Sequence, residues 1–188
     1  CLVGSEMCIR DRVYAATNPQ AIAPSAVPVA IEGYAHLFAQ PRAMSDADIA
    51  EVIRRFADTA ALAEQAGFDG VQVHAAHGYL LSQFLSPLTN RREDRWGGSL
   101  ENRARILVEI IRAIRARVAP GFGLGVKLNS SDFQKGGFDA QDAVAVVRML
   151  NDLPVDLVEL SGGSYESPAM HGRPQQASTR QSLSLIHI

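Results

Sequence analysis

The chain has 188 residues, of which 47% are hydrophobic, 20% charged and 6% aromatic, a composition that excludes a disordered tail and a low-complexity polymer. The net charge is −2 and no block of basic residues occurs, so we do not expect nucleic acid as a partner. No apolar run approaches the roughly 20 residues that cross a bilayer, and no leader pattern opens the chain, so we expect a soluble, cytoplasmic protein with no membrane partner.

Both ends of the chain differ from its body. Residues 1–12, which contain both cysteines, and residues 182–188 look like translated sequencing-adapter sequence and fit no periodic pattern. We therefore expect non-native ends at 1–12 and 182–188 and one partial domain over 13–181. That body has no cysteine for a disulfide, a nucleophile or a metal site.

The body begins with an irregular stretch. Residues 13–44 hold four of the nine prolines and sustain no period, which predicts an extended connection over the surface. Ser45 then offers an N-cap for a helix whose apolar residues recur at helical spacing until Gly67. A short β-branched strand is predicted at 70–74.

This order of helix and strand repeats twice more. Ser99 begins a second helix, which ends before a strand at 124–128. Asp139 begins a third, followed by a strand at 155–160. The alternation with short links predicts parallel strands and an α/β fold.

The polar residues of these strands favour a barrel over an open doubly wound sheet. Gln72 and His74 alternate with valines, and Lys127 alternates with apolar residues in the second strand. A strand between two helix layers would be apolar on both faces, whereas a barrel strand directs polar groups inward at a ligand. The third strand is less regular, since Asp156 and Glu159 lie on opposite faces.

The chemistry concentrates after the first strand. His74, His77 and Tyr79 give two neutral donors and a weak acid near one point, a set suited to holding a carbonyl oxygen and protonating carbon. Lys127 shares the interior face with His74, and a buried ammonium needs an anion, for which phosphate and the electron-rich edge of a reduced flavin are candidates.

Two other interpretations remain open for these residues. The histidines are, in the simplest case, ordinary polar groups at a strand end. They are alternatively two ligands of a metal-assisted hydrolase, although no His-Glu-x-x-His motif or cysteine supplies a third ligand and we expect no metal. Arg91, Arg92, Asp94 and Glu101 are interpreted as a surface ion-pair and capping cluster that shapes the loop, with no chemical role.

Several motifs together carry a resemblance to a known family. They are Val-Gln-Val-His-Ala-Ala-His-Gly-Tyr-Leu-Leu-Ser-Gln-Phe-Leu-Ser-Pro within 70–105, then Gly-Val-Lys-Leu-Asn-Ser-Ser-Asp-Phe (125–133), Gly-Gly-Phe (136–138) and Val-Asp-Leu-Val-Glu-Leu-Ser-Gly-Gly (155–163). The sequence closely resembles the Old Yellow Enzyme family of FMN-dependent ene reductases and NADH:flavin oxidoreductases. The resemblance covers nearly all of 13–181.

The resemblance implies an FMN-binding (β/α)8 TIM barrel, of which this chain holds about three of the eight strands. It implies that NADH or NADPH reduces the flavin, which then reduces the activated C=C bond of a small α,β-unsaturated carbonyl (enone-type) substrate. It is compatible with assembly of the protein as a homo-oligomer. Because the other strands are absent, we expect the chain alone to be an inactive truncated fragment that neither binds FMN tightly nor turns over.

The resemblance also implies roles for single residues. His74 and His77 would be catalytic and would bind the substrate's carbonyl oxygen, and Tyr79 would protonate the α-carbon. Lys127 would bind the cofactor, at a position where many members have an arginine that contacts the flavin ring. Lysine keeps the charge but loses the bidentate fork of arginine.

Overall fold

The computed structural model describes residues 2–3, 21–31, 35–164 and 166. The elements in chain order are β1 (Leu2–Val3), β2 (Ala21–Ala23), the 3-10 helix η1 (Ala35–Leu37), β3 (Pro41–Ala43), α2 (Asp46–Gln65), β4 (Gly70–Ala75), α3 (Leu80–Leu85), α4 (Leu100–Arg115), β5 (Gly123–Asn129), α5 (Ala140–Asn151) and β6 (Leu157–Ser161). No helix among these residues is both long enough and apolar enough to span a bilayer.

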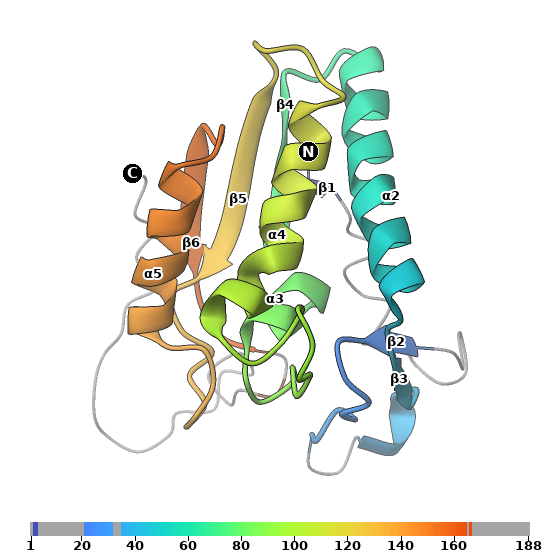
Figure 1. Ribbon diagram of the computed structural model, residues 1–188, viewed down its shortest axis with the longest axis vertical. Coiled ribbons are helices and arrows are strands. Elements are labelled where there is room, and N and C mark those ends of the chain that lie inside the picture. Colours follow the sequence, from blue (N-terminus) through green and yellow to red (C-terminus); the bar gives the residue numbers. More distant parts are fainter. Residues whose placement is uncertain (1, 4–20, 32–34, 165, 167–188) are drawn as a thin grey trace.

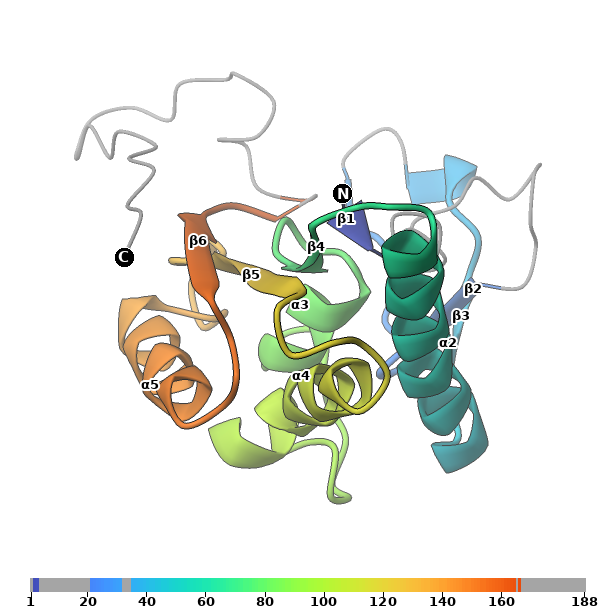
Figure 2. The same cartoon turned by 90° about the horizontal axis from the view of Figure 1, so that it is seen from above.

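The main sheet is parallel throughout and runs in the order β1-β4-β5-β6. Helices α2, α4 and α5 all pack on one of its faces (Figures 1 and 2). The predicted alternation of helices with parallel strands is therefore confirmed. β6 begins two residues later than the predicted strand at 155–160.

The three long helices begin at the residues that the sequence indicated. The Ser45 side chain accepts from Asp48 N, and Asp48 returns the bond to the Ser45 backbone, which completes a capping box before α2. The side chains of Ser99 and Asp139 cap α4 and α5 by accepting hydrogen bonds from backbone N–H groups of the first turn. Gly67, at a φ of 87°, follows the end of α2.

The core lies between the sheet and these helices. The strand residues that face it include Val73 and Leu124, and the helix residues include Phe56 and Ile110, all at 0% exposure. Burying each such side chain contributes roughly 1.5–3 kcal/mol. The opposite face of the strands carries polar side chains, so the sheet is apolar toward the helices and polar toward the interior of a barrel.

The prediction of a surface connection over 13–44 is wrong in part: many of the residues that the structure describes there are exposed, but others are buried or form paired strands. β2 and β3 pair in parallel as a separate two-stranded sheet. Residues 21–23 are buried, as are Phe38, Ala39 and Met44. Strands of three residues are too short to show a period in the sequence, which explains why the pattern missed them.

Two residues near the N-terminus belong to the main sheet. Leu2–Val3, within the segment expected to be non-native, forms an edge strand in register with Gln72 and Val73 of β4. The rest of 1–12 and all of 182–188 lie outside the described residues. The adapter origin of both ends stays a prediction.

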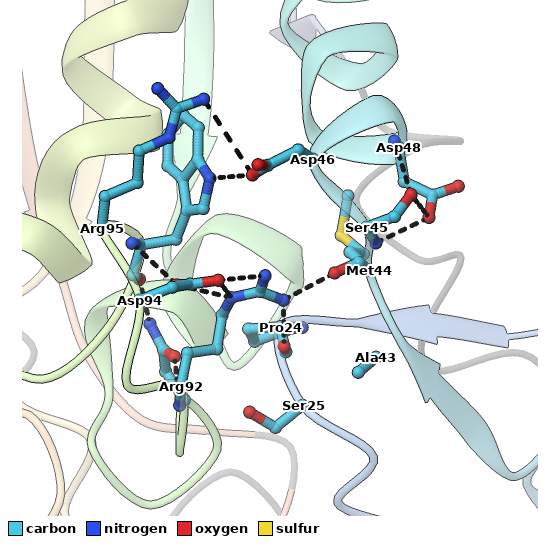
Figure 3. Close-up of polar contacts among 12 residues, drawn as sticks. Pro24, Ser25, Ala43, Met44, Ser45, Asp46, Asp48, Arg92, Asp94 and Arg95 are labelled. Atoms are coloured by element: carbon cyan, nitrogen blue, oxygen red, sulfur yellow. Dashed lines mark hydrogen bonds and ion pairs between the residues drawn. The ribbon is translucent and has the colours of Figure 1, made fainter.

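Arg92 joins the small β2–β3 sheet to the rest of the fold (Figure 3). Its guanidinium pairs with Asp94 and also donates to Pro24 O at 2.9 Å and Met44 O at 2.6 Å. Its side chain is only 13% exposed. The ion pair with Asp94 was predicted correctly. The predicted surface position of Arg92 was wrong, because its guanidinium is largely buried and donates hydrogen bonds to two carbonyl groups of a segment far away in sequence.

Candidate active site

His74, His77 and Tyr79 meet at the carboxyl end of β4. The His74 ring lies 5.1 Å from the His77 ring and 5.2 Å from the Tyr79 ring, centroid to centroid, and both contacts are edge-to-face. His74 is buried at 9% exposure, on the strand face opposite Val73. The structure thus brings together the three residues that the sequence singled out.

His77 has a backbone conformation that is uncommon for a residue with a side chain. Its φ is +62°, in the left-handed region, which costs of order 1–3 kcal/mol and persists only where surrounding contacts hold the residue in place. Two strands impose it here: the His77 N–H donates to Asn129 Oδ1 at 3.0 Å, and His77 Nε2 lies 2.6 Å from Ser161 Oγ. The backbone of His77 is therefore held from β5, and its ring is held from β6.

Asn129 is the residue that the sequence interpretation missed. Its side chain, 1% exposed, accepts from His77 and donates to Asp132 Oδ1 at 3.0 Å and Gly163 O at 2.8 Å. It thus connects the ends of β4, β5 and β6. The available signal was its position at the end of β5, on the same face as Lys127.

Asp132 extends this polar cluster. Its second oxygen accepts from Phe138 N at 3.1 Å, and burial raises the pKa of its carboxyl group. The nearby Gly162 meets the Phe133 ring so closely that a Cβ would lie 2.8 Å from a ring atom. A side chain at position 162 would therefore require the exposed Phe133 ring to move.

Lys127 lies on the interior face, as predicted, in register with His74 on one side and Glu159 on the other. Its ammonium is 2.8 Å from Glu159 Oε1. Within the chain, then, the anion that the buried ammonium needs is the carboxylate of Glu159, where the sequence interpretation considered only phosphate or a flavin.

The electrostatics keep both imidazoles neutral. Burial, followed by the charges of His77 and Lys127, lowers the pKa of His74 to about 4, although Glu159 opposes the shift. Burial and Lys127 also lower the pKa of His77. Near pH 7 each ring therefore retains one N–H donor and one acceptor nitrogen.

The metal alternative gains nothing from this geometry. In the part of the chain that the structure describes, no group of three or more His, Cys, Asp or Glu side chains is arranged to hold a metal ion. The nitrogen His77 Nε2 contacts a serine hydroxyl.

Comparisons with known proteins identify the family. The chain matches the NADH:flavin oxidoreductase / NADH oxidase family over residues 4–183. It is 46% identical over 150 residues to the NADH-dependent flavin oxidoreductase nadA of Aspergillus parasiticus, an alignment that covers 80% of this chain and 34% of the relative. It is 43% identical over 143 residues to an NADPH dehydrogenase of Geobacillus thermodenitrificans, covering 76% and 40%.

A solved structure agrees with these relatives. The old yellow enzyme homologue of Zymomonas mobilis superposes with a TM-score of 0.68 at 29% identity, over 80% of this chain and 44% of that one. The chain thus spans between about a fifth and two fifths of the length of the curated relatives it matches.

These matches confirm the predicted fold, an α/β chain that forms part of a (β/α)8 barrel. They also confirm, for the family, the predicted cofactors FMN and NADH or NADPH. The chain belongs to the NADH:flavin oxidoreductase / NADH oxidase family, which includes the Old Yellow Enzyme homologues.

Proposed function

We propose that this chain is part of an FMN-dependent enzyme that uses NADH or NADPH to reduce activated C=C bonds of α,β-unsaturated carbonyl compounds. The observation that carries the proposal is the cluster at the carboxyl end of β4, in which the neutral imidazole of His74 contacts both the neutral imidazole of His77 and the phenol ring of Tyr79. Active sites of (β/α)8 barrels lie at this end of the strands.

The interior face of the described strands has donors of the kind that FMN requires. The ammonium of Lys127 suits the electron-rich edge of a reduced flavin, and the side chain is still 21% exposed when paired with Glu159. Leu157, on the same face of β6, is 37% exposed and offers apolar surface. We therefore assign Lys127 as the residue of this chain that would hold the flavin ring.

When bound, FMN would carry hydride from the nicotinamide to the alkene. The N–H groups of His74 and His77 donate hydrogen bonds to the substrate's carbonyl oxygen. This polarisation withdraws electron density from the β-carbon. Because the pKa of His74 is about 4, the ring donates this bond as a neutral group at pH 7 and does not release a proton to the oxygen.

Tyr79 is the proposed proton donor to the α-carbon. Its ring lies edge-to-face against His74, so a substrate held by the histidines is next to the phenol. Proton transfer from a positioned side chain contributes typically 10²–10⁴-fold to a rate. The α-carbon becomes basic only as hydride reaches the β-carbon, which couples the two events.

The experiment that tests the proposal follows the flavin colour of a full-length chain, in which this segment is continued to the length of its relatives. We expect flavin absorbance in the purified protein, bleaching on addition of NADH or NADPH, and recovery on addition of an enone such as cyclohexenone. A folded but colourless protein would refute the flavin assignment. Bleaching without recovery by any enone would refute the substrate class.

A further inference from the structure

The carboxylate of Glu159 has two different partners on the interior face of the sheet. Oε1 pairs with the ammonium of Lys127 at 2.8 Å, and Oε2 accepts from Gln72 Nε2, also at 2.8 Å. The side chains of Lys127 and Glu159 are 21% and 19% exposed. A lysine ammonium on a flexible four-carbon stem has many alternative positions, so a fixed carboxylate restricts where its charge lies.

The residue of β5 that lies next to Gln72 is a glycine. Gln72 is in β4 and Glu159 is in β6, on either side of β5, and adjacent strands lie about 4.8 Å apart. The residue of β5 in register with Gln72 is Gly125, and a Cβ there would lie 3.5 Å from Gln72 Cγ. Any longer side chain at 125 would occupy the space in which Gln72 reaches toward Glu159.

The charge of this group bears directly on the proposed cofactor site. An unpaired ammonium beside a flavin stabilises the reduced form, which carries more negative charge than the oxidised form. A carboxylate bonded to that ammonium offsets much of this effect. The two charges also act in opposite directions on His74, whose pKa Lys127 lowers and Glu159 raises.

We propose that Glu159 is a positioning residue that holds the Lys127 ammonium and offsets its charge, supported by Gln72 and by the space above Gly125. Glu159 thereby weakens the preference of the site for reduced over oxidised FMN. This inference rests on the proposed function, since it requires FMN next to Lys127.

The test measures the affinities of oxidised FMN and of dithionite-reduced FMN for the full-length protein and its variants. In Glu159→Gln, which keeps the size of the side chain and removes its charge, we expect the ratio of reduced to oxidised affinity to rise at least tenfold. That ratio corresponds to an upward shift of about 30 mV in the two-electron midpoint potential. The matched control is Glu93→Gln, the same change at an exposed loop position, which we expect to leave the ratio unchanged.

A second pair of variants tests whether Glu159 acts through Lys127. In a Lys127→Met background, we expect Glu159→Gln to change the affinity ratio by less than threefold, because the cation that it offsets is gone. An equal change in both backgrounds would show that the carboxylate acts on the flavin directly and would overturn the positioning role. If Glu159→Gln does not fold, Gln72→Met provides the same test, with a smaller rise expected.

The outcomes separate this inference from the proposed function. A wild-type protein that bleaches with NADH or NADPH, together with a Glu159→Gln ratio equal to wild type, would overturn the role of Glu159 alone. A wild-type protein that folds but binds no FMN would overturn both. A raised ratio in Glu159→Gln and an unchanged ratio in Glu93→Gln would support the proposal.

Discussion

Replacing Asn129 by alanine would remove the link between the ends of β4, β5 and β6. The change deletes the acceptor of the His77 N–H and the donor to Asp132 Oδ1 and Gly163 O, in a side chain that is 1% exposed. A buried polar group left without its partner costs about 1–3 kcal/mol. Three groups lose a partner: the His77 N–H, Asp132 Oδ1 and Gly163 O. Water entering the vacated space would recover part of the summed cost, so we expect the free energy of unfolding to fall by about 3 kcal/mol.

The assay is chemical denaturation of the full-length apoprotein, followed by circular dichroism. We expect a lower denaturation midpoint at unchanged m-value, together with weaker binding of a phenol ligand of the site, because the left-handed backbone of His77 loses its support. The control is Asn151→Ala at the exposed end of α5, with an expected change below about 0.5 kcal/mol. A loss below about 1 kcal/mol in Asn129→Ala would refute the reasoning.

Three further predictions concern other parts of the chain. The pKa of His74 is lowered on folding from 6.5 to about 4, so the unfolded chain binds more protons between these values. Stability should therefore fall as the pH drops from 6.5 to 4, by about 3 kcal/mol at most, and pH-dependent denaturation of a His74→Asn variant should show a flatter profile over that window. Tyr79→Phe should spare reduction of the flavin by NADH or NADPH and slow its reoxidation by an enone at least tenfold in stopped-flow measurements; equal slowing of both steps would contradict the proton-donor role. Arg92→Leu leaves the carbonyl groups of Pro24 and Met44 without their donor and should lower stability by about 2–4 kcal/mol, with faster proteolysis within residues 21–44, and cleavage at the wild-type rate would argue against the docking role.

Local rules predicted much of the fold correctly. The starts of the three long helices followed from Ser45, Ser99 and Asp139, because a capping side chain acts on backbone groups within three residues of itself. The interior position of His74 and Lys127 followed from strict alternation along a strand.

The failures have equally local causes. Helix α3 is buried on all sides, so it shows no periodic pattern, and its six residues are too few to reveal one. Asp156 precedes β6, so comparing it with Glu159 obscured the alternation that places Glu159 beside Lys127. The role of Asn129 depends on groups from three segments, whose meeting no single stretch of sequence encodes.

Trp96 is the one tryptophan of the chain, and it lies where the loop before α4 meets the first residue of α2. The side chain is 2% exposed, and its indole N–H donates to Asp46 Oδ1 at 2.6 Å. Its intrinsic fluorescence therefore comes from a single, dry environment outside the His74–Tyr79 cluster. A red shift of that emission on heating would mark the separation of loop and helix, so the molecule contains its own optical probe of this junction and needs no label.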